Sequence, residues 1–168
     1  MRSLRSYVYE AAARLAEIDL NEALVPAARD GGASEIRDLL DARGGDRAMP
    51  DGTVFAGKSP DTGKAMYTTP ADAPLTYTFN EAARYAGQLN AQKYLGHDDW
   101  HVPTRGELNV LFRNRAVIGG FNEIGSLPAG WYWSSSPYDF LDAWAQRFSD
   151  GSQYNSHRND DSSLRCVR

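Results

Sequence analysis

The sequence predicts an α+β fold, in which helices are segregated from a mainly antiparallel sheet. Three observations indicate this class: a hairpin pattern comes first, two helix-start signatures follow it, and only strand and loop patterns occur from Trp131 onward. At 168 residues with 42% hydrophobic residues, the chain can bury a substantial core. Its single cysteine, Cys166, excludes an intrachain disulfide framework and a thiolate-rich zinc site, so packing alone must hold the fold.

Residues 1–46 are predicted to form a short N-terminal helical segment, separate from residues 47–168. Apolar residues recur at three- and four-residue steps over residues 3–19, which is typical of an amphipathic helix. Ser34 can cap a second short helix, and Gly44-Gly45 ends it. The apolar helical face is expected either to bind a partner helix or a second copy of the chain, or to fold back on its own domain.

A hairpin and a helix are predicted next. Short strand patterns at residues 53–55 and 64–69 flank a turn of the Ser-Pro-Asp-Thr-Gly type at residues 59–63. The sequence Thr78-Phe-Asn-Glu81 has the spacing of a capping box, in which the two end side chains satisfy free backbone N–H groups at a helix start. Apolar residues continue at helical spacing after it, so we expect a helix as far as about Leu95.

A short strand, a second helix and a long β-region complete the prediction. Residues 100–102 have a strand pattern, and Thr104-Arg-Gly-Glu107 is a second capping box that begins a helix through Phe112. The four tryptophans lie at positions 100, 131, 133 and 144. An aromatic cluster can stack on sugar rings, but we expect core packing for these residues, with at most one of Trp131 and Trp133 exposed.

Several residues invite a catalytic or metal-binding interpretation that the surrounding sequence does not favour. Ser134-Ser-Ser136 lacks a nucleophile elbow and a neighbouring base. The histidines and aspartates at 97, 98, 99 and 101 match no standard zinc motif, so turn and capping roles are expected. Asn159-Asp-Asp161 offers hard oxygen ligands for calcium, but the Glu-Pro-Asn, Gln-Pro-Asp and Trp-Asn-Asp motifs of calcium-dependent sugar-binding lectins are absent. We therefore expect no catalytic residue, no metal site and no cofactor, and a buried, unreactive Cys166.

Charge and hydropathy exclude further classes. The formal net charge of -4 and the isoelectric point near 5.3 give no basic field for nucleic acid. Arginines 147, 158, 165 and 168 can form an anion site, but the neighbouring aspartates favour a mixed-charge protein-binding surface. No secretory signal pattern and no membrane-spanning run are present, so we expect synthesis in the cytoplasm and no membrane insertion. Release within a phage virion at lysis is one route out of the cell.

The stretch from residue 138 to residue 161 carries the functional prediction. It is rich in the short polar and aromatic side chains that antibody paratopes favour, so we expect it to bind a protein or glycan ligand. The candidate ligand-binding residues are Tyr138, Asp139, Phe140, Asp142, Arg147, Ser152, Tyr154, Asn155, Ser156, His157, Arg158, Asn159, Asp160 and Asp161.

Four ordered motifs resemble one known family. They are Trp100-His-Val-Pro-Thr-Arg-Gly-Glu-Leu108, Tyr132-Trp-Ser-Ser-Ser136, Ala143 to Phe148 with Asp150-Gly151, and Arg165-Cys-Val-Arg168. Together they resemble the Lcl-type C-terminal domain family over roughly residues 50–168. The resemblance implies a C-type-lectin-like fold. Enzymes of that broad fold depend on a cysteine pair or a histidine constellation that this chain does not reproduce, so an enzyme is not expected.

Many members of that family resemble the variable proteins of diversity-generating retroelements, in which template adenines are randomised. Randomised AAC codons yield residues such as Tyr, Asp, His, Ser, Arg, Phe and Asn, but never Lys, Glu, Met, Gln or Trp. The candidate positions hold only residues that such codons allow, whereas Trp144, Gln146, Phe148, Gly151 and Gln153 are interpreted as scaffold. A diversified, ligand-binding variable protein is therefore expected. The alternative is a non-diversified structural or assembly protein of a phage or surface complex.

Overall fold

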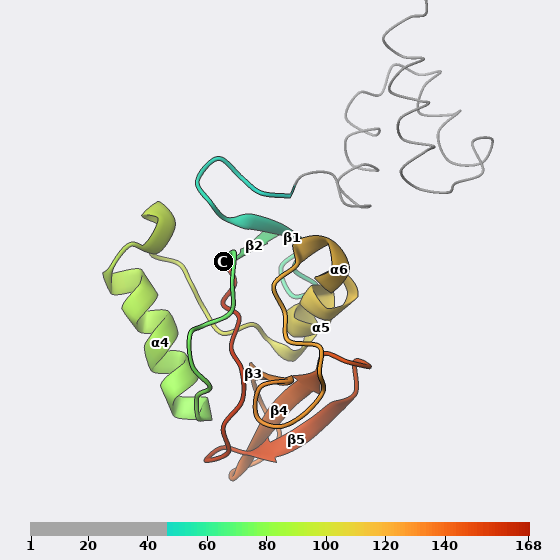
Figure 1. Ribbon diagram of the computed structural model, residues 1–168. Coiled ribbons are helices and arrows are strands. Elements are labelled where there is room, and N and C mark those ends of the chain that lie inside the picture. Colours follow the sequence, from blue (N-terminus) through green and yellow to red (C-terminus); the bar gives the residue numbers. More distant parts are fainter. Residues whose placement is uncertain (1–46) are drawn as a thin grey trace, which may run out of the picture. The chain divides into compact units, whose positions relative to one another are not determined.

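A computed structural model describes residues 47–168 of the protein (Figure 1). The helices predicted within residues 1–46, and any docking through them, lie outside the described residues. The described elements are β1 (Val54–Lys58), β2 (Ala65–Thr68), α4 (Phe79–Ala91), η1 (Tyr94–Gly96), α5 (Arg105–Arg113), α6 (Arg115–Ile118), β3 (Trp131–Pro137), β4 (Asp142–Arg147) and β5 (Gln153–His157). Across residues 47–168 they combine helices with a two-stranded and a three-stranded antiparallel sheet, so the predicted α+β class is confirmed.

The predicted hairpin is the β1–β2 pair. Its strands are antiparallel, and the turn closes through the N–H of Ser59 donating to the carbonyl of Lys64 at 2.9 Å. The register shifts between Phe55 and Gly57, and the backbone φ of Gly57 is +127°. Such a bulge with a positive φ is readily adopted only by glycine, which explains the residue at this position.

Both predicted capping boxes are present. The Glu81 carboxylate accepts the backbone N–H of Thr78 at 3.0 Å, and the Glu107 carboxylate accepts that of Thr104 at 3.0 Å. Helix α4 ends at Ala91 rather than near Leu95, because Lys93 adopts a left-handed φ of 48° and starts a separate 3-10 turn. The short helix α6 has no counterpart in the prediction. No helix within residues 47–168 is long and apolar enough to span a membrane.

The strand predicted at residues 100–102 is wrong, because only His101 pairs there. Its N–H and carbonyl bond the carbonyl and N–H of Val167 at 2.8 and 3.0 Å. Pro103 follows and has no N–H to donate, so the ladder cannot continue. The residues just before Arg168 likewise form isolated bridges rather than a strand. The segment of residues 162–168 changes partner along its length, and therefore ties the hairpin, the loop before α4 and strand β3 together.

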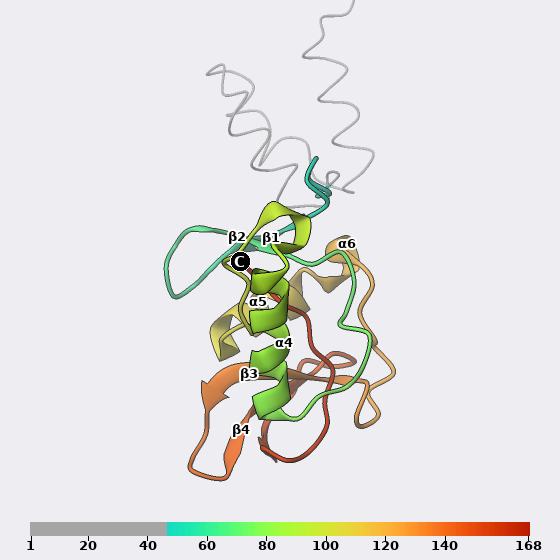
Figure 2. The same ribbon diagram turned by 90° about the vertical axis from the view of Figure 1, so that its left-hand side faces the viewer.

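Within the described residues the core lies on both faces of the β3–β4–β5 sheet. On one face, Trp133 and Ala145 pack with apolar residues of α4 in one buried cluster. On the other, Tyr132 packs with Leu108 of α5 and with Phe148 in a second cluster. Figures 1 and 2 show α4 along one side of the molecule and α5 with α6 along the other. The two faces of the sheet therefore pack against different helices.

The tryptophans divide between core and surface. Trp100 and Trp133 are 2% and 0% exposed, which confirms their predicted core positions. Trp131 and Trp133 are two residues apart and so share a face of β3, and Trp131 is half-buried at the edge of the core. The prediction of a core position is wrong for Trp144, which is half-buried. It points away from the face of β4 that Ala145 buries, because successive strand residues alternate.

Arg165 is buried rather than part of a surface anion site. Its side chain is fully enclosed and its Nε donates to Asp72 at 2.7 Å. Its terminal nitrogens donate to the carbonyls of Thr69 at 2.6 Å and Gly119 at 3.0 Å. Cys166 beside it is also buried, as predicted, and burial raises the pKa of its thiol to about 12. A thiol so protonated is unreactive at neutral pH.

Candidate functional site

Strand pairing places the candidate residues on two opposite faces of the sheet. Asp142 lies opposite His157, and Ala145 lies opposite Tyr154, in an antiparallel β4–β5 register. Because side chains alternate, Asp142, Asn155 and His157 share the face of Trp144, here called the Trp144 face. Arg147, Tyr154 and Ser156 share the opposite face with Trp131, here called the Trp131 face. The candidate residues therefore do not form one continuous surface.

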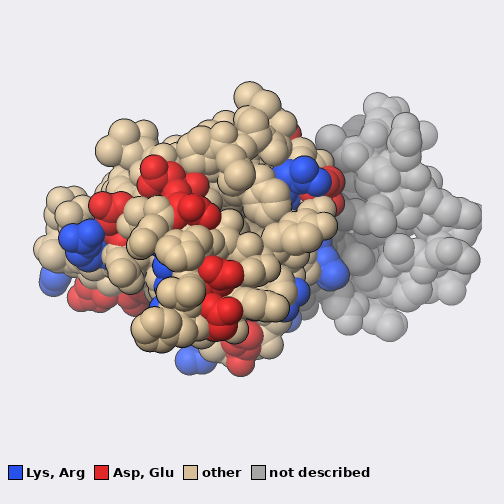
Figure 3. Space-filling model, turned by 90° about the horizontal axis from the view of Figure 1, so that it is seen from below, with Lys and Arg blue, Asp and Glu red and all other residues tan. Residues whose placement is uncertain are grey.

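Exposure of the candidate residues fits a surface role. None of them is buried. The half-buried ones are Asp142, Arg147, Ser152, Ser156 and Arg158, and the exposed ones are Tyr138, Asp139, Phe140, Tyr154, Asn155, His157, Asn159, Asp160 and Asp161. Figure 3, which views the molecule from the end that holds this sheet, shows acidic and basic side chains scattered among uncharged surface.

The Trp144 face is organised around an aromatic stack. The guanidinium carbon of Arg105, at the start of α5, lies 3.5 Å from the centroid of the Trp144 ring. Arg105 Nε also donates to Gln153 at 2.7 Å, and Tyr138 packs edge-on against Trp144 with centroids 5.1 Å apart. Asn155 Nδ2 donates to a carboxylate oxygen of Asp142 at 2.6 Å. No sequence pattern indicated that Arg105, within a capping box, would reach this face.

The β3–β4 connection forms an exposed apolar tip. This hairpin tip, residues 138–141, carries Tyr138, Phe140 and Leu141, which are 52%, 90% and 56% exposed. Asp139 Oδ1 accepts the N–H groups of Leu141 and Asp142, each at 2.8 Å, and so closes the turn. Leu141 was not among the predicted binding residues, because its position follows from this turn rather than from a binding-type side chain.

The Trp131 face combines an exposed tyrosine with an ion pair. Tyr154 is 61% exposed and its ring centroid lies 6.0 Å from that of Trp131. The guanidinium of Arg147 lies over the Trp131 ring, 5.5 Å from its centroid, and pairs with Asp150. Hydrogen bonds from Arg147 and from the N–H of Ser152 lower the pKa of Asp150 to about 2. This face therefore offers one aromatic ring beside a paired charge.

Arg158 links the turn after β5 to the β3–β4 turn through hydrogen bonds. Its Nη2 donates to the carbonyl of Asp139 at 2.8 Å, and its N–H donates to the carbonyl of Leu141 at 2.9 Å. Its guanidinium also lies over the ring of Phe79, 4.9 Å from the centroid. The turn after β5 is closed by Asp160, whose carboxylate accepts the N–H of His157 at 3.2 Å. Arg158 is consequently tied to the fold more than the sequence indicated.

The positions interpreted as scaffold make fixed contacts. Gln146 is 1% exposed and its amide donates to the carbonyl of Gly151 and to Asn109, both at 3.1 Å. Gly151 has a φ of +80°, and a Cβ there would lie 2.4 Å from the Phe112 ring. Phe148 is fully buried. Substitution at these positions would disturb the sheet itself.

The polar residues considered for catalysis or metal binding have separate partners. His97 pairs with Asp51 at 2.8 Å, and Asp99 pairs with Arg168. Ser134 is buried, and its hydroxyl donates to the carbonyl of Trp144 at 2.8 Å. In the part of the chain from residue 47 onward, no three His, Cys, Asp or Glu side chains converge as metal ligands. Neither a nucleophile with a base nor a metal centre is assembled among these groups.

A pocket of about 290 Å³ lies beside the β1–β2 hairpin. Its wall includes His101, whose Nε2 lies 3.1 Å from the buried Glu107 carboxylate. Hydrogen bonding to Glu107 raises the pKa of His101. Burial alone would raise the pKa of Glu107, but hydrogen bonds from His101, Thr104 and Ser59 outweigh it and lower that pKa. The pair thus favours its charged form.

The His101–Glu107 pair predicts a pH-dependent contribution to stability. A raised histidine pKa adds stability that is full below the unfolded value of 6.5 and is lost as pH rises through the folded pKa. A lowered glutamate pKa adds stability that is present above 4.5 and is lost as pH falls. His101→Gln should therefore destabilise the protein more at about pH 6 than at about pH 8, by less than about 1 kcal/mol because His101 is partly exposed. Urea denaturation at both pH values measures this, and an equal loss at both would contradict it.

Comparison with known proteins gives one match. The model of the Lcl C-terminal domain family matches residues 46–168, a stretch that contains every candidate residue. No curated protein matches the chain.

Proposed function

The chain belongs to the Lcl C-terminal domain family, and we propose that residues 47–168 form a C-type-lectin-like domain that binds a protein or glycan. One observation carries the proposal. A three-stranded sheet buries Trp133 and Tyr132 in opposite cores and presents large aromatic side chains to solvent, Tyr138 and Phe140 at the β3–β4 turn and Tyr154 on β5. Large exposed aromatic side chains on a rigid sheet supply contact area with few rotatable bonds. That combination favours recognition.

Binding is favoured over catalysis by what the polar groups do. The Ser134 hydroxyl is buried and bonded to a backbone carbonyl, so it is not presented to a substrate. The half-exposed His101 is paired with a carboxylate that also accepts bonds from Ser59 and the backbone of Thr104. Catalytic sites require a nucleophile or acid beside a free base, and these groups serve the fold instead.

A diversified surface is the most specific form of the proposal. Randomised AAC codons cannot yield Trp or Gln, and the Trp and Gln residues of this stretch have defined contacts. Trp144 stacks with Arg105, Gln146 bonds Asn109, and Gln153 bonds Gln146. The exposed positions of β5 and the hairpin tip hold residues that those codons allow. Diversity would then fall where side chains can change at little cost in stability.

Arg158 favours the second candidate, a structural or assembly protein with a fixed partner. This residue lies within the stretch proposed to vary, yet it bonds the backbone of Asp139 and covers the ring of Phe79. A position with such contacts tolerates change poorly. A surface whose sequence does not vary would keep Arg158 and these contacts unchanged.

Alanine substitution separates recognition from stability. Tyr154→Ala with His157→Ala should change the free energy of unfolding by about 0.5 kcal/mol or less, because both side chains are exposed. We expect the same double variant to weaken ligand binding by about tenfold or more. Arg158→Ala should instead cost about 1 kcal/mol or more of stability, through its lost hydrogen bonds.

The measurements are chemical denaturation and binding to ligands found on a glycan array and in a displayed library of protein fragments. Ser149→Ala, on an exposed serine outside the candidate set, is the matched control for a neutral surface change. Unchanged affinity in the Tyr154 and His157 double variant would remove the Trp131 face and the end of β5 from the binding surface. A chain that binds no protein and no glycan would overturn the proposal.

A further inference from the structure

We propose that the hairpin tip, residues 138–141, is an apolar anchor that enters a pocket on a protein partner, and that this pocket has a basic rim. The inference rests on the proposed function and deepens it, since it selects a protein over a glycan as the ligand. It follows from the exposure of the tip, the way the tip is held, and the charges around it.

Exposure of the tip indicates an interaction surface. Phe140 is 90% exposed, and its neighbours Leu141 and Tyr138 are more than half exposed. Single exposed apolar residues are ordinary, but a contiguous group marks a site that another surface covers. Phe140 and Leu141 have no hydrogen-bonding side-chain group, and the Asp139 carboxylate is already used within the turn. Sugars present many hydroxyls that need such groups, so an apolar protein pocket fits the tip better.

The tip is held in one conformation before a partner arrives. Asp139 closes the turn with two hydrogen bonds, and Arg158, directly after β5, donates hydrogen bonds to the carbonyls of Asp139 and Leu141. Tyr138 within the tip packs edge-on against Trp144, and the guanidinium of Arg105 lies over the Trp144 ring. A preformed anchor loses little conformational entropy on binding, which favours tight association.

Charges around the tip specify the rim of the partner pocket. The tip and Asp142 lie beside residues 157–161, because Arg158 bonds Leu141 and Asp142 pairs with His157. These two stretches contain four carboxylates and one guanidinium, that of Arg158, so they are acidic. The carboxylates belong to Asp139, Asp142, Asp160 and Asp161. Acidic side chains are visible on this end of the molecule in Figure 3. Complementarity then calls for Lys and Arg around the apolar pocket.

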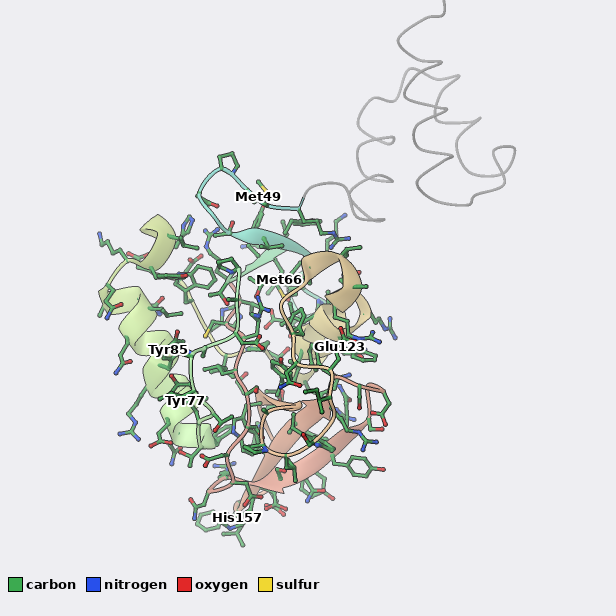
Figure 4. All side chains as sticks on the ribbon, viewed as in Figure 1. Met49, Met66, Tyr77, Tyr85, Glu123 and His157 are labelled. Atoms are coloured by element: carbon green, nitrogen blue, oxygen red, sulfur yellow. The ribbon has the colours of Figure 1, made fainter. Side chains whose placement is uncertain are left out.

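A second exposed apolar pair supplies the matched control. Ile124 and Leu127, in the loop before β3, are 81% and 65% exposed. Figure 4 places Glu123 of this loop well away from His157 at the end of the sheet. Serine at Ile124 and Leu127 therefore removes a similar amount of exposed apolar surface without touching the tip.

The test pans a displayed library of protein fragments against the full chain and probes a glycan array in parallel. Binders selected on the parent are then measured against Phe140→Ser with Leu141→Ser, against Phe140→Ser alone, and against Ile124→Ser with Leu127→Ser. The tip variants should lose about tenfold or more in affinity, while the control pair keeps the parental value. Affinity should also fall with added salt and with Asp161→Asn, because a basic rim is attracted to the acidic end.

The outcomes distinguish the inference from the proposed function. Protein binders that tolerate the tip variants, or a glycan ligand insensitive to them, would overturn the anchor while leaving a binding domain. Loss of binding equally in the Ile124 and Leu127 control would also overturn it. A chain that binds neither library nor array would overturn both. Denaturation of each variant confirms folding, and Phe140→Ser alone remains informative if the double variant is unstable.

Discussion

Replacing Trp133 with alanine is expected to lower the free energy of unfolding by about 3 to 5 kcal/mol. The side chain is 0% exposed and packs in the cluster between α4 and the β3–β4–β5 sheet. Its ring meets Phe79 edge-on at 5.8 Å, and its Nε1 donates to the carbonyl of Tyr77 at 2.7 Å. Alanine removes the packing, leaves a cavity and strands a carbonyl acceptor. Chemical denaturation of the two proteins measures the difference.

Trp144→Ala is the matched control for Trp133→Ala. Trp144 has the same side chain on the neighbouring strand, but it is half-buried and packs against the side chains of Arg105 and Tyr138. We expect a smaller loss of stability, because less apolar surface leaves water at this position. A Trp133 variant as stable as the parent, or a larger loss for Trp144, would contradict the assigned core.

Arg165→Ala is expected to cost about 3 to 5 kcal/mol, because it leaves the half-buried Asp72 carboxylate without its counter-charge and removes a fully buried side chain. The Arg165 side chain is fully buried against Asp72, whose other oxygen accepts the hydroxyl of Tyr132 at 2.5 Å. Burial raises the pKa of Asp72, and Arg165 opposes that rise. Removing the guanidinium also strands the carbonyls of Thr69 and Gly119.

The Arg165 prediction has a pH signature and a matched control. Without the guanidinium, the folded pKa of Asp72 rises further, so the variant gains stability relative to the parent as falling pH protonates this carboxyl. Arg168→Ala removes a guanidinium whose carboxylate partner, Asp99, is largely exposed, and should cost about 0 to 1 kcal/mol. Denaturation at acidic and neutral pH measures both variants. Equal, small losses for Arg165 and Arg168 would contradict the buried network.

Local signals were sufficient for the hairpin and for the two main helices. Each capping box depends on residues only three positions apart, and the turn at residues 59–63 is likewise set by its own sequence. These features form where the sequence places them because short-range contacts define them. The end of α4 could not be predicted in this way, since it depends on the left-handed backbone of Lys93.

The features that the sequence could not predict depend on pairing between residues far apart in the chain. His101 and Val167 pair across the chain, and the pattern around each suggested an ordinary strand. Arg165 and Arg168 look alike in sequence, yet one is enclosed by Asp72 and the other lies near the surface. The candidate stretch was identified by composition, but its division between the Trp144 face and the Trp131 face depends on the β4–β5 register.

Sequencing the neighbourhood of the gene tests most directly whether the exposed end of the sheet is a diversified binding surface. The proposal predicts a reverse-transcriptase gene and a near-copy of the coding segment for residues 131–168. The copies should differ only opposite template adenines, with changes at exposed positions such as Tyr138, Phe140 and Tyr154 and none at Trp133 or Phe148. Absence of a near-copy, or changes spread equally over buried positions, would contradict diversification and favour a domain with a fixed partner.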